Sequence, residues 1–188
     1  MLRPATPDDL VPTWLVRSHP GVSEWLNSSP SDLDAYRDLF LDPGRIAKTV
    51  VIEREGTVIG EVMCALEDAW AQVEVAARAS GVQVELGWVI DPAHGGQGLA
   101  TEAVLEMMRC CFEDLGLRRV TAYCYADNAA SWRLMERVGM RREVTTRADL
   151  LHRRGTWHDG YGYAMLASEW SAKRSPTTAT PSGDRPGS

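Results

Sequence analysis

A cluster of glycines in the middle of the chain is the segment best suited to chemistry. Residues 91–102 read Asp-Pro-Ala-His-Gly-Gly-Gln-Gly-Leu-Ala-Thr-Glu and stand between a strand-like stretch and a helix-like one. The first turn of a helix has unpaired N–H groups and the positive end of the helix dipole, which attract phosphate oxygens. Glycine lets the backbone approach such a ligand closely. The segment predicts a phosphate-binding loop whose contacts come from Gly95, Gly96, Gln97, Gly98, Leu99, Ala100 and Thr101.

Three kinds of phosphate-binding loop compete for this segment. A Walker loop ends in Gly-Lys-Ser/Thr, and the segment contains no lysine. A Rossmann loop would begin at Gly96, but Thr101 replaces its third glycine and the segment lies in mid-chain. The third is the Q/R-x-x-G-x-G/A pyrophosphate loop of the GNAT superfamily of N-acetyltransferases. Residues 95–100 resemble it closely, with Gly95 where Gln or Arg is usual.

Two flanking segments extend the resemblance over residues 82–142. Residues 85–92 (Glu-Leu-Gly-Trp-Val-Ile-Asp-Pro) resemble the fourth strand of the superfamily, and Asn128-x-x-Ser131 with Gly139-Met140 resembles its second cofactor motif. Together they are similar to the RimJ/RimL-like branch. The resemblance implies an α/β fold, with a mixed, mostly antiparallel central sheet of about six to seven strands and helices on both faces. It also implies acetyl-CoA as co-substrate.

The same resemblance assigns roles in cofactor binding. It implies that the strand containing Trp88, Val89 and Ile90 splays away from its neighbour, so that backbone N–H groups are free to bind the cofactor. The Val89 N–H would polarise the thioester carbonyl, and Asn128 would hydrogen-bond the pantetheine arm. A helix cap is an equally ordinary role for Asn128, and both roles can coexist.

Two residues are candidates for proton transfer in a direct attack of an amine on the thioester. Glu85 shares a strand face with Val89 and could act as a base through water, although a solvated glutamate is an equally good interpretation. Relatives often carry a tyrosine that protonates the thiolate where this chain has Met135. The branch implies Ser131 instead, which could also be a small packing residue. His94 and Asp159 are the alternative bases.

The acceptor would be a primary amine, either a protein N-terminus or a small molecule. Trp25 and Trp157 lie where relatives form the acceptor site, although core packing is the better interpretation of both. Glu24 and Asp159 could bind a cationic acceptor. A non-catalytic acyl-CoA-binding or sensing domain is the alternative function, and Met135 favours it to some extent.

The surrounding elements follow from residue patterning. Val82 to Ile90 alternates as a strand, with Val84, Leu86, Trp88 and Ile90 expected on one face. The stripe from Ala100 to Leu115 predicts a long helix ended by Gly116. Residues 67–81 have no assignment. The remaining predicted elements are helices from Thr6, Ser31 and Asn128, a hairpin over 49–53 and 57–66, and strands over 120–125, 141–151 and 157–166.

Composition limits the classes of partner. The 188 residues carry a net charge of −6, which disfavours binding nucleic acid through a broad basic surface. No stretch reaches the roughly 18 apolar residues of a membrane span, and the start of the chain does not read as a signal peptide. Four cysteines without a C-x-x-C pair indicate a cytoplasmic setting and no metal site.

The domain boundary follows from composition as well. Residues 1–170 are expected to form one domain, with a disordered Ser/Thr/Pro/Gly-rich tail over 171–188. The sequence leaves both a monomer and a homodimer open.

Overall fold

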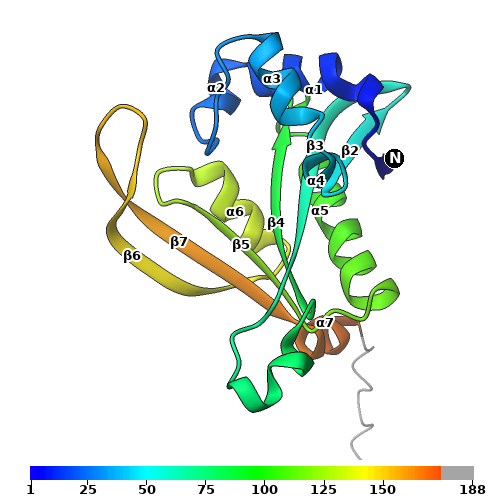
Figure 1. The fold of residues 1–188 in the computed structure, drawn as a ribbon, viewed down its shortest axis with the longest axis vertical. Coiled ribbons are helices and arrows are strands. Elements are labelled where there is room, and N and C mark those ends of the chain that lie inside the picture. Colours follow the sequence, from blue (N-terminus) through cyan, green and yellow to red (C-terminus); the bar gives the residue numbers. More distant parts are fainter. Residues whose placement is uncertain (175–188) are drawn as a thin grey trace, which may run out of the picture.

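A seven-stranded sheet forms the centre of the fold in a computed structural model, which describes residues 1–174 (Figure 1). Its order is β1-β2-β3-β4-β5-β7-β6, and only the β4–β5 pair is parallel. The prediction of a mixed, mostly antiparallel sheet is confirmed. The strands are β1 (Leu2–Pro4), β2 (Thr49–Arg54), β3 (Thr57–Glu67), β4 (Gln83–Ile90), β5 (Arg119–Tyr125), β6 (Arg141–Leu151) and β7 (Trp157–Leu166).

Within residues 1–174, seven α-helices surround the sheet. Asp32 and Asp42 begin α3 and α4 by accepting hydrogen bonds from backbone N–H groups of the first turn, as N-cap residues do. No helix in the described part of the chain is long and apolar enough to cross a membrane. The helices are α1 (Leu10–Arg17), α2 (Pro20–Ser23), α3 (Leu33–Phe40), α4 (Pro43–Ile46), α5 (Leu99–Arg109), α6 (Ala129–Arg137) and α7 (Ala167–Arg174).

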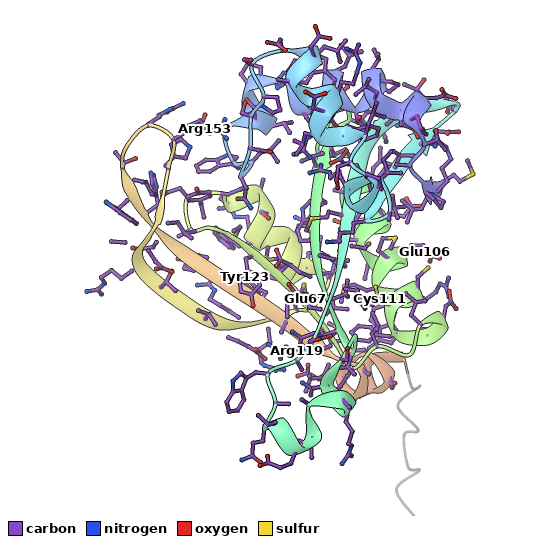
Figure 2. The ribbon with its side chains drawn as sticks, in the orientation of Figure 1. Glu67, Glu106, Cys111, Arg119, Tyr123 and Arg153 are labelled. Carbon is purple, nitrogen blue, oxygen red and sulfur yellow. The ribbon has the colours of Figure 1, made fainter. Side chains whose placement is uncertain are left out.

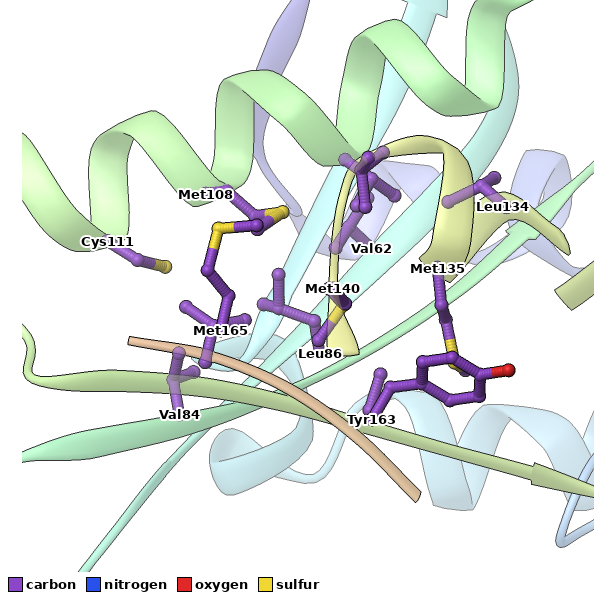
Figure 3. Packing of buried hydrophobic residues seen from close by; sticks show 14 of the residues in the cluster. Val62, Val84, Leu86, Met108, Cys111, Leu134, Met135, Met140, Tyr163 and Met165 are labelled. Atoms are coloured by element: carbon purple, nitrogen blue, oxygen red, sulfur yellow. The ribbon is translucent and has the colours of Figure 1, made fainter. Parts of the chain in front are cut away.

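Two apolar clusters hold the helices to the sheet. The larger lies beneath α5, α6 and α7, where Met108, Leu134 and Trp170 pack on strand residues such as Val84 and Leu86 (Figure 3). The smaller joins helices α1, α3 and α4 to the β1–β2–β3 end of the sheet and is centred on these buried residues: Ala5, Tyr36, Phe40 and Val51. The expectation of helices on both faces is therefore met.

The C-terminal helix continues past residue 170, the expected end of the domain. Helix α7, which residue patterning does not predict, runs to Arg174, and its last turns make contacts of their own. The Ser171 hydroxyl donates to the Ala167 carbonyl at 3.0 Å, and the Lys173 ammonium donates to the Gly139 carbonyl at 2.8 Å. The rest of the expected tail, residues 175–188, lies outside the described residues.

Several further elements depart from the sequence prediction, including the short helices α2 and α4, which residue patterning does not predict. Strand β1 was missed because three residues at a sheet edge carry little periodicity. The unassigned segment contains a short 3₁₀ helix, η2 (Val73–Ala79). A π-helical turn, η4 (Cys110–Asp114), extends α5, and its extra residue per turn moves Leu115 off the core-facing stripe to 67% exposure.

Candidate active site

Strands β4 and β5 open into a V, which is the central feature of the candidate site. Their parallel register runs only from Gln83–Arg119 to Glu85–Thr121. Beyond that point β4 stays paired with β3 as far as Ile90, and β5 stays paired with β7 as far as Tyr125, so the two strands diverge (Figure 1). The β4 edge that turns away from β5 contains Trp88, Val89 and Ile90, the residues expected to bind cofactor.

The side chains along β4 alternate between the two faces of the sheet as expected, with different degrees of burial. Val84 and Leu86 are buried beneath α5, as predicted, whereas Trp88 and Ile90 are half-buried at the edge of that cluster. Val89 is 9% exposed on the other face, opposite Glu61 of β3. The strand is covered on both faces near its end, which holds the backbone between Trp88 and Ile90 in place.

Gly60 sets how closely β3 can approach this part of β4. A Cβ atom at Gly60 would lie 2.4 Å from the Val89 carbonyl oxygen and 3.1 Å from the Ile90 Cα. No side chain fits there unless the two strands separate. Gly60 therefore fixes the position of the same β4 residues that line the open edge of the V.

We expect Gly60→Ala to destabilise the fold by about 1–3 kcal/mol, because the methyl group must push β4 away from β3. Urea unfolding measures this. Gly87→Ala is the matched control on β4, since a Cβ there would lie 3.4 Å from the flexible Met63 Sδ-methyl carbon. Equal stability of the two variants would show that the β3–β4 contact at Gly60 is not tight.

The glycine loop leads into α5 in a conformation that only glycine adopts easily. Gly96 and Gly98 have φ values of +72° and +80°, and Gly98 is the N-cap residue of α5. No side chain caps this helix, and a Cβ at either glycine would meet nothing within 4 Å. The N–H groups of Leu99, Ala100 and Thr101 thus begin a helix without a side-chain partner, as a phosphate site requires.

Two arginines that sequence patterning did not single out flank the loop. The Arg54 guanidinium of β2 donates to the Gln97 side-chain oxygen at 2.9 Å, and Arg137 of α6 donates to the Thr101 hydroxyl at 3.1 Å. Both side chains come from elements distant in sequence, so no local motif identifies them. They add positive charge on two sides of the helix start, which favours an anionic ligand.

Asn128 and Ser131 meet at the start of α6, across the V from β4. The Asn128 side-chain oxygen accepts a hydrogen bond from the Ser131 N–H at 3.2 Å, so the capping role holds. The Ser131 hydroxyl interacts with the thiol of Cys124 on β5, whose pKa burial nonetheless raises to about 11. Met135, in the next turn, is 1% exposed and belongs to the core.

Glu85 lies at the vertex of the V, opposite Thr121. Partial burial, followed by the negative charge of Glu67, raises its pKa above the ordinary value. Figure 2 marks Glu67 on β3 together with Arg119 and Tyr123 on β5, where the strands converge. Val89 is four residues further along the strand, about 13 Å at 3.3 Å per residue, so Glu85 reaches that level only through water.

The open end of the V is covered by contacts between the segment after α2 and the β6–β7 hairpin. The His152 Nε2 atom lies 3.0 Å from the Glu24 carbonyl oxygen, and Arg154 pairs with the Glu24 carboxylate at 3.0 Å. The Trp25 ring packs against Tyr125 and His152, with ring centroids 5.8 and 6.0 Å apart. Arg153, at the hairpin tip in Figure 2, donates to the Leu26 carbonyl.

Three candidates for the acceptor site or for the general base remain: Trp157, Asp159 and His94. Trp157 is 61% exposed, so the core-packing interpretation is wrong for it. One Asp159 carboxylate oxygen accepts a hydrogen bond from the Ala148 N–H at 2.9 Å, where the backbone has a positive φ. His94 is half-buried at the end of the short 3₁₀ helix η3 (Pro92–His94), and no hydrogen bond reaches its Nδ1 atom.

Similar curated proteins carry N-acetyltransferase names. "Uncharacterized N-acetyltransferase YnaD" of Bacillus subtilis (strain 168) is 36% identical over 87 residues, which is 46% of this chain and about half (51%) of that relative. "Putative ribosomal N-acetyltransferase YdaF" of the same organism is 27% identical over 164 residues, covering 85% of this chain and 86% of that protein.

Solved structures share the fold. A GNAT-family acetyltransferase from Bacillus anthracis superposes with a TM-score of 0.73 at 26% identity, over 89% of this chain and 95% of that one. Mycobacterium smegmatis RimJ in complex with CoA-disulfide gives 0.71 at 21% identity, over 89% and 82% of the two chains. At 21% identity the RimJ likeness shows the fold alone, whereas the similarity to YdaF agrees with the RimJ/RimL-like branch. The model of the acetyltransferase (GNAT) domain matches residues 1–141, and the chain therefore belongs to the GNAT acetyltransferase family.

Proposed function

We propose that the protein transfers an acetyl group from acetyl-CoA to a primary amine by direct attack on the thioester. The observation that carries the proposal is the V between β4 and β5, which opens beside an uncapped helix start with left-handed glycines. Family membership supports the reaction class, and the RimJ structure with CoA-disulfide supports a CoA-type donor.

The residues present fit such a donor. The N–H groups from Gly98 to Thr101 would hold the pyrophosphate, with space open around Gly96 and Gly98 and with Arg54 and Arg137 adding positive charge. The β4 edge and Asn128 would hold the pantetheine arm. The Val89 N–H would donate to the thioester oxygen, where negative charge develops during attack.

Proton transfer is the remaining chemical requirement. Glu85 would draw a proton from the acceptor nitrogen through water, and its raised pKa suits that role. The Ser131 hydroxyl would donate to the departing thiolate. The acceptor is a cationic amine before deprotonation, either a protein N-terminus or a small molecule, and the net charge of −6 favours both kinds equally.

One observation favours a non-catalytic, acyl-CoA-binding alternative. Met135 occupies the position where many relatives carry a proton-donating tyrosine, and it is buried in the core. A protein of this kind would bind the donor without turnover. Incubation with acetyl-CoA and a panel of primary amines and N-terminal peptides, with free thiol measured, separates the two functions. Thiol release that depends on an amine supports the enzyme, whereas none across the panel supports the binding domain.

Acetyl-CoA is expected to raise the melting temperature, whereas NAD and ATP are not. A ligand that binds only the native state at 100 times its Kd adds about 2.7 kcal/mol to the free energy of unfolding. A thermal shift assay at several ligand concentrations measures the effect. A shift with NAD alone would contradict the CoA assignment, because the loop would then act as a dinucleotide site.

A further inference from the structure

A hydrogen-bonded chain of three side chains lies at the start of β7. The Asp127 carboxylate is 2.5 Å from His158 Nδ1, and His158 Nε2 is 2.8 Å from the Thr156 hydroxyl. A carboxylate only accepts, so Nδ1 carries the proton in the tautomer that this contact selects, which leaves the Nε2 lone pair toward Thr156. Nucleophile–base–carboxylate chains use the same order of groups to activate a hydroxyl or an incoming amine.

Strand register places this chain at the open end of the V. Thr121 is level with Glu85, so Tyr125, four residues on, is level with Val89 across the divergence. Tyr125 pairs with Gly160 of β7, and His158 stands two residues before Gly160 on the same face. The rings of Tyr125 and His158 meet edge to face with centroids 5.8 Å apart.

Exposure and neighbours single out His158 among the polar groups there. Its side chain is 22% exposed, and Thr156 is exposed, so protons can pass between Nε2 and solvent. In His152, by contrast, both ring nitrogens are engaged, with the Glu24 carbonyl and the Arg154 N–H. The titratable groups that contact His158 are Asp127, Tyr125 and His152, and His152 in turn contacts Glu24 and Arg154.

We propose that Asp127, His158 and Thr156 form a proton relay that deprotonates the acceptor ammonium; this rests on the acetyl-transfer function proposed above. The ammonium gives one proton to the Thr156 oxygen as Thr156 passes its own to His158 Nε2. This leaves a neutral amine and an imidazolium paired with Asp127. An ammonium must lose two protons to become an amide, so the relay and Glu85 serve different steps.

The acetyl transfer itself forms one bond and breaks another. The amine nitrogen forms a bond to the thioester carbon, the carbon–sulfur bond breaks, and the electron pair leaves on sulfur. The second nitrogen proton passes through water to Glu85. The Ser131 hydroxyl gives its proton to the thiolate, and the proton held by Glu85 restores that hydroxyl through water. The imidazolium returns its proton to water through Thr156, so each turnover releases amide, CoA thiol and one proton. Thr156 is exposed, which suits the proton that leaves to solvent, and the half-buried Glu85 suits the proton that stays.

The test uses the amine identified in the panel and measures kcat/KM against pH for single variants of the full chain. His158→Gln is expected to lower kcat/KM by about 10²-fold near pH 6.5. The loss should shrink toward pH 9–10, because free amine then forms without help; amine pKa values lie near about 8 to 10. Thr156→Val should behave in the same way, whereas Thr156→Ser should keep most of the activity.

Controls separate a proton relay from a structural role. His19→Asn removes an exposed imidazole that caps α2 while keeping a capping side chain, and it should leave the pH profile unchanged. Acetyl-CoA affinity and melting temperature should stay the same in all variants. A loss in His158→Gln that is equal at every pH would overturn the relay, as would full activity.

A second measurement does not depend on turnover. Nitrogen-15 NMR of the imidazoles in the unchanged protein should show His158 in the Nδ1–H tautomer, and Asp127→Asn should convert it to a mixture. Another tautomer would overturn the relay directly. If the unchanged protein shows the Nδ1–H form but acetylates no amine in the panel, the proposed function fails and the relay as a step in acetyl transfer fails with it.

Discussion

Replacing Gly98 by valine is expected to weaken acetyl-CoA binding by at least about 100-fold. The residue has a φ of +80°, where a β-branched side chain is strained, and it begins the helix that would hold the pyrophosphate. Each hydrogen bond to a charged group contributes about 1.5–3 kcal/mol, so loss of two such bonds is sufficient. Isothermal titration calorimetry with acetyl-CoA gives the affinity directly.

Gly116→Val is the matched control for this substitution. Gly116 also has a positive φ, +64°, and a Cβ there would likewise meet nothing within 4 Å, but it lies beyond the far end of α5. Both variants should lose stability through the same backbone strain. Only Gly98→Val should lose the ligand. Equal affinities in the two variants would mean that the loop does not hold the phosphates.

Glu85→Gln is expected to lower kcat by about 10²-fold, with acetyl-CoA affinity near that of the unchanged protein. Burial and the charge of Glu67 raise the pKa of Glu85 in the fold, so the ionised side chain destabilises the native state. That penalty grows as pH rises from the unfolded-state pKa, near about 4.3, through the higher native value. The neutral amide removes it, so the variant should be at least as stable at pH 7.

Two further variants serve as comparisons for Glu85→Gln. Ser131→Ala should reduce kcat by only about 10-fold, because CoA thiolate is a tolerable leaving group near neutral pH. Glu67→Gln removes the neighbouring charge while leaving the Glu85 carboxyl in place, and its kcat should stay close to the unchanged value. Full activity of Glu85→Gln across the pH range would move the second proton transfer to another group.

Local sequence predicts the parts of the site that depend on local backbone chemistry. Gly98 adopts the conformation that only glycine favours, and Asn128 caps the helix that its position indicated. The family resemblance implies that β4 and β5 diverge, whereas no periodicity in the sequence predicts it. The glycine loop and the Asn128 cap each depend on a few consecutive residues. The residue type there restricts φ, caps a helix or leaves the first N–H groups of a helix without a side-chain partner.

Long-range contacts explain what the sequence did not predict. Arg137 meets Thr101 across 36 residues, and His158 meets Asp127 across 31, so no spacing rule connects them. Leu115 was expected in the core, but the π-helical turn before it adds a residue and leaves Leu117 buried instead. The Leu115 N–H donates to the Cys110 carbonyl oxygen, five residues earlier. This i to i+5 hydrogen bond changes which residues of the helix face the core.

The last strand of the described residues, β7, is an interior strand of the sheet. Strand β7 inserts between β5 and β6, and its residues Tyr163, Ala164 and Met165 are at most 1% exposed. During synthesis, β5 therefore keeps an unpaired edge until Leu166 has left the ribosome. Pairing between distant segments is slow, and unpaired strand edges promote aggregation. The sheet is consequently completed only by residues made more than 150 positions after β1.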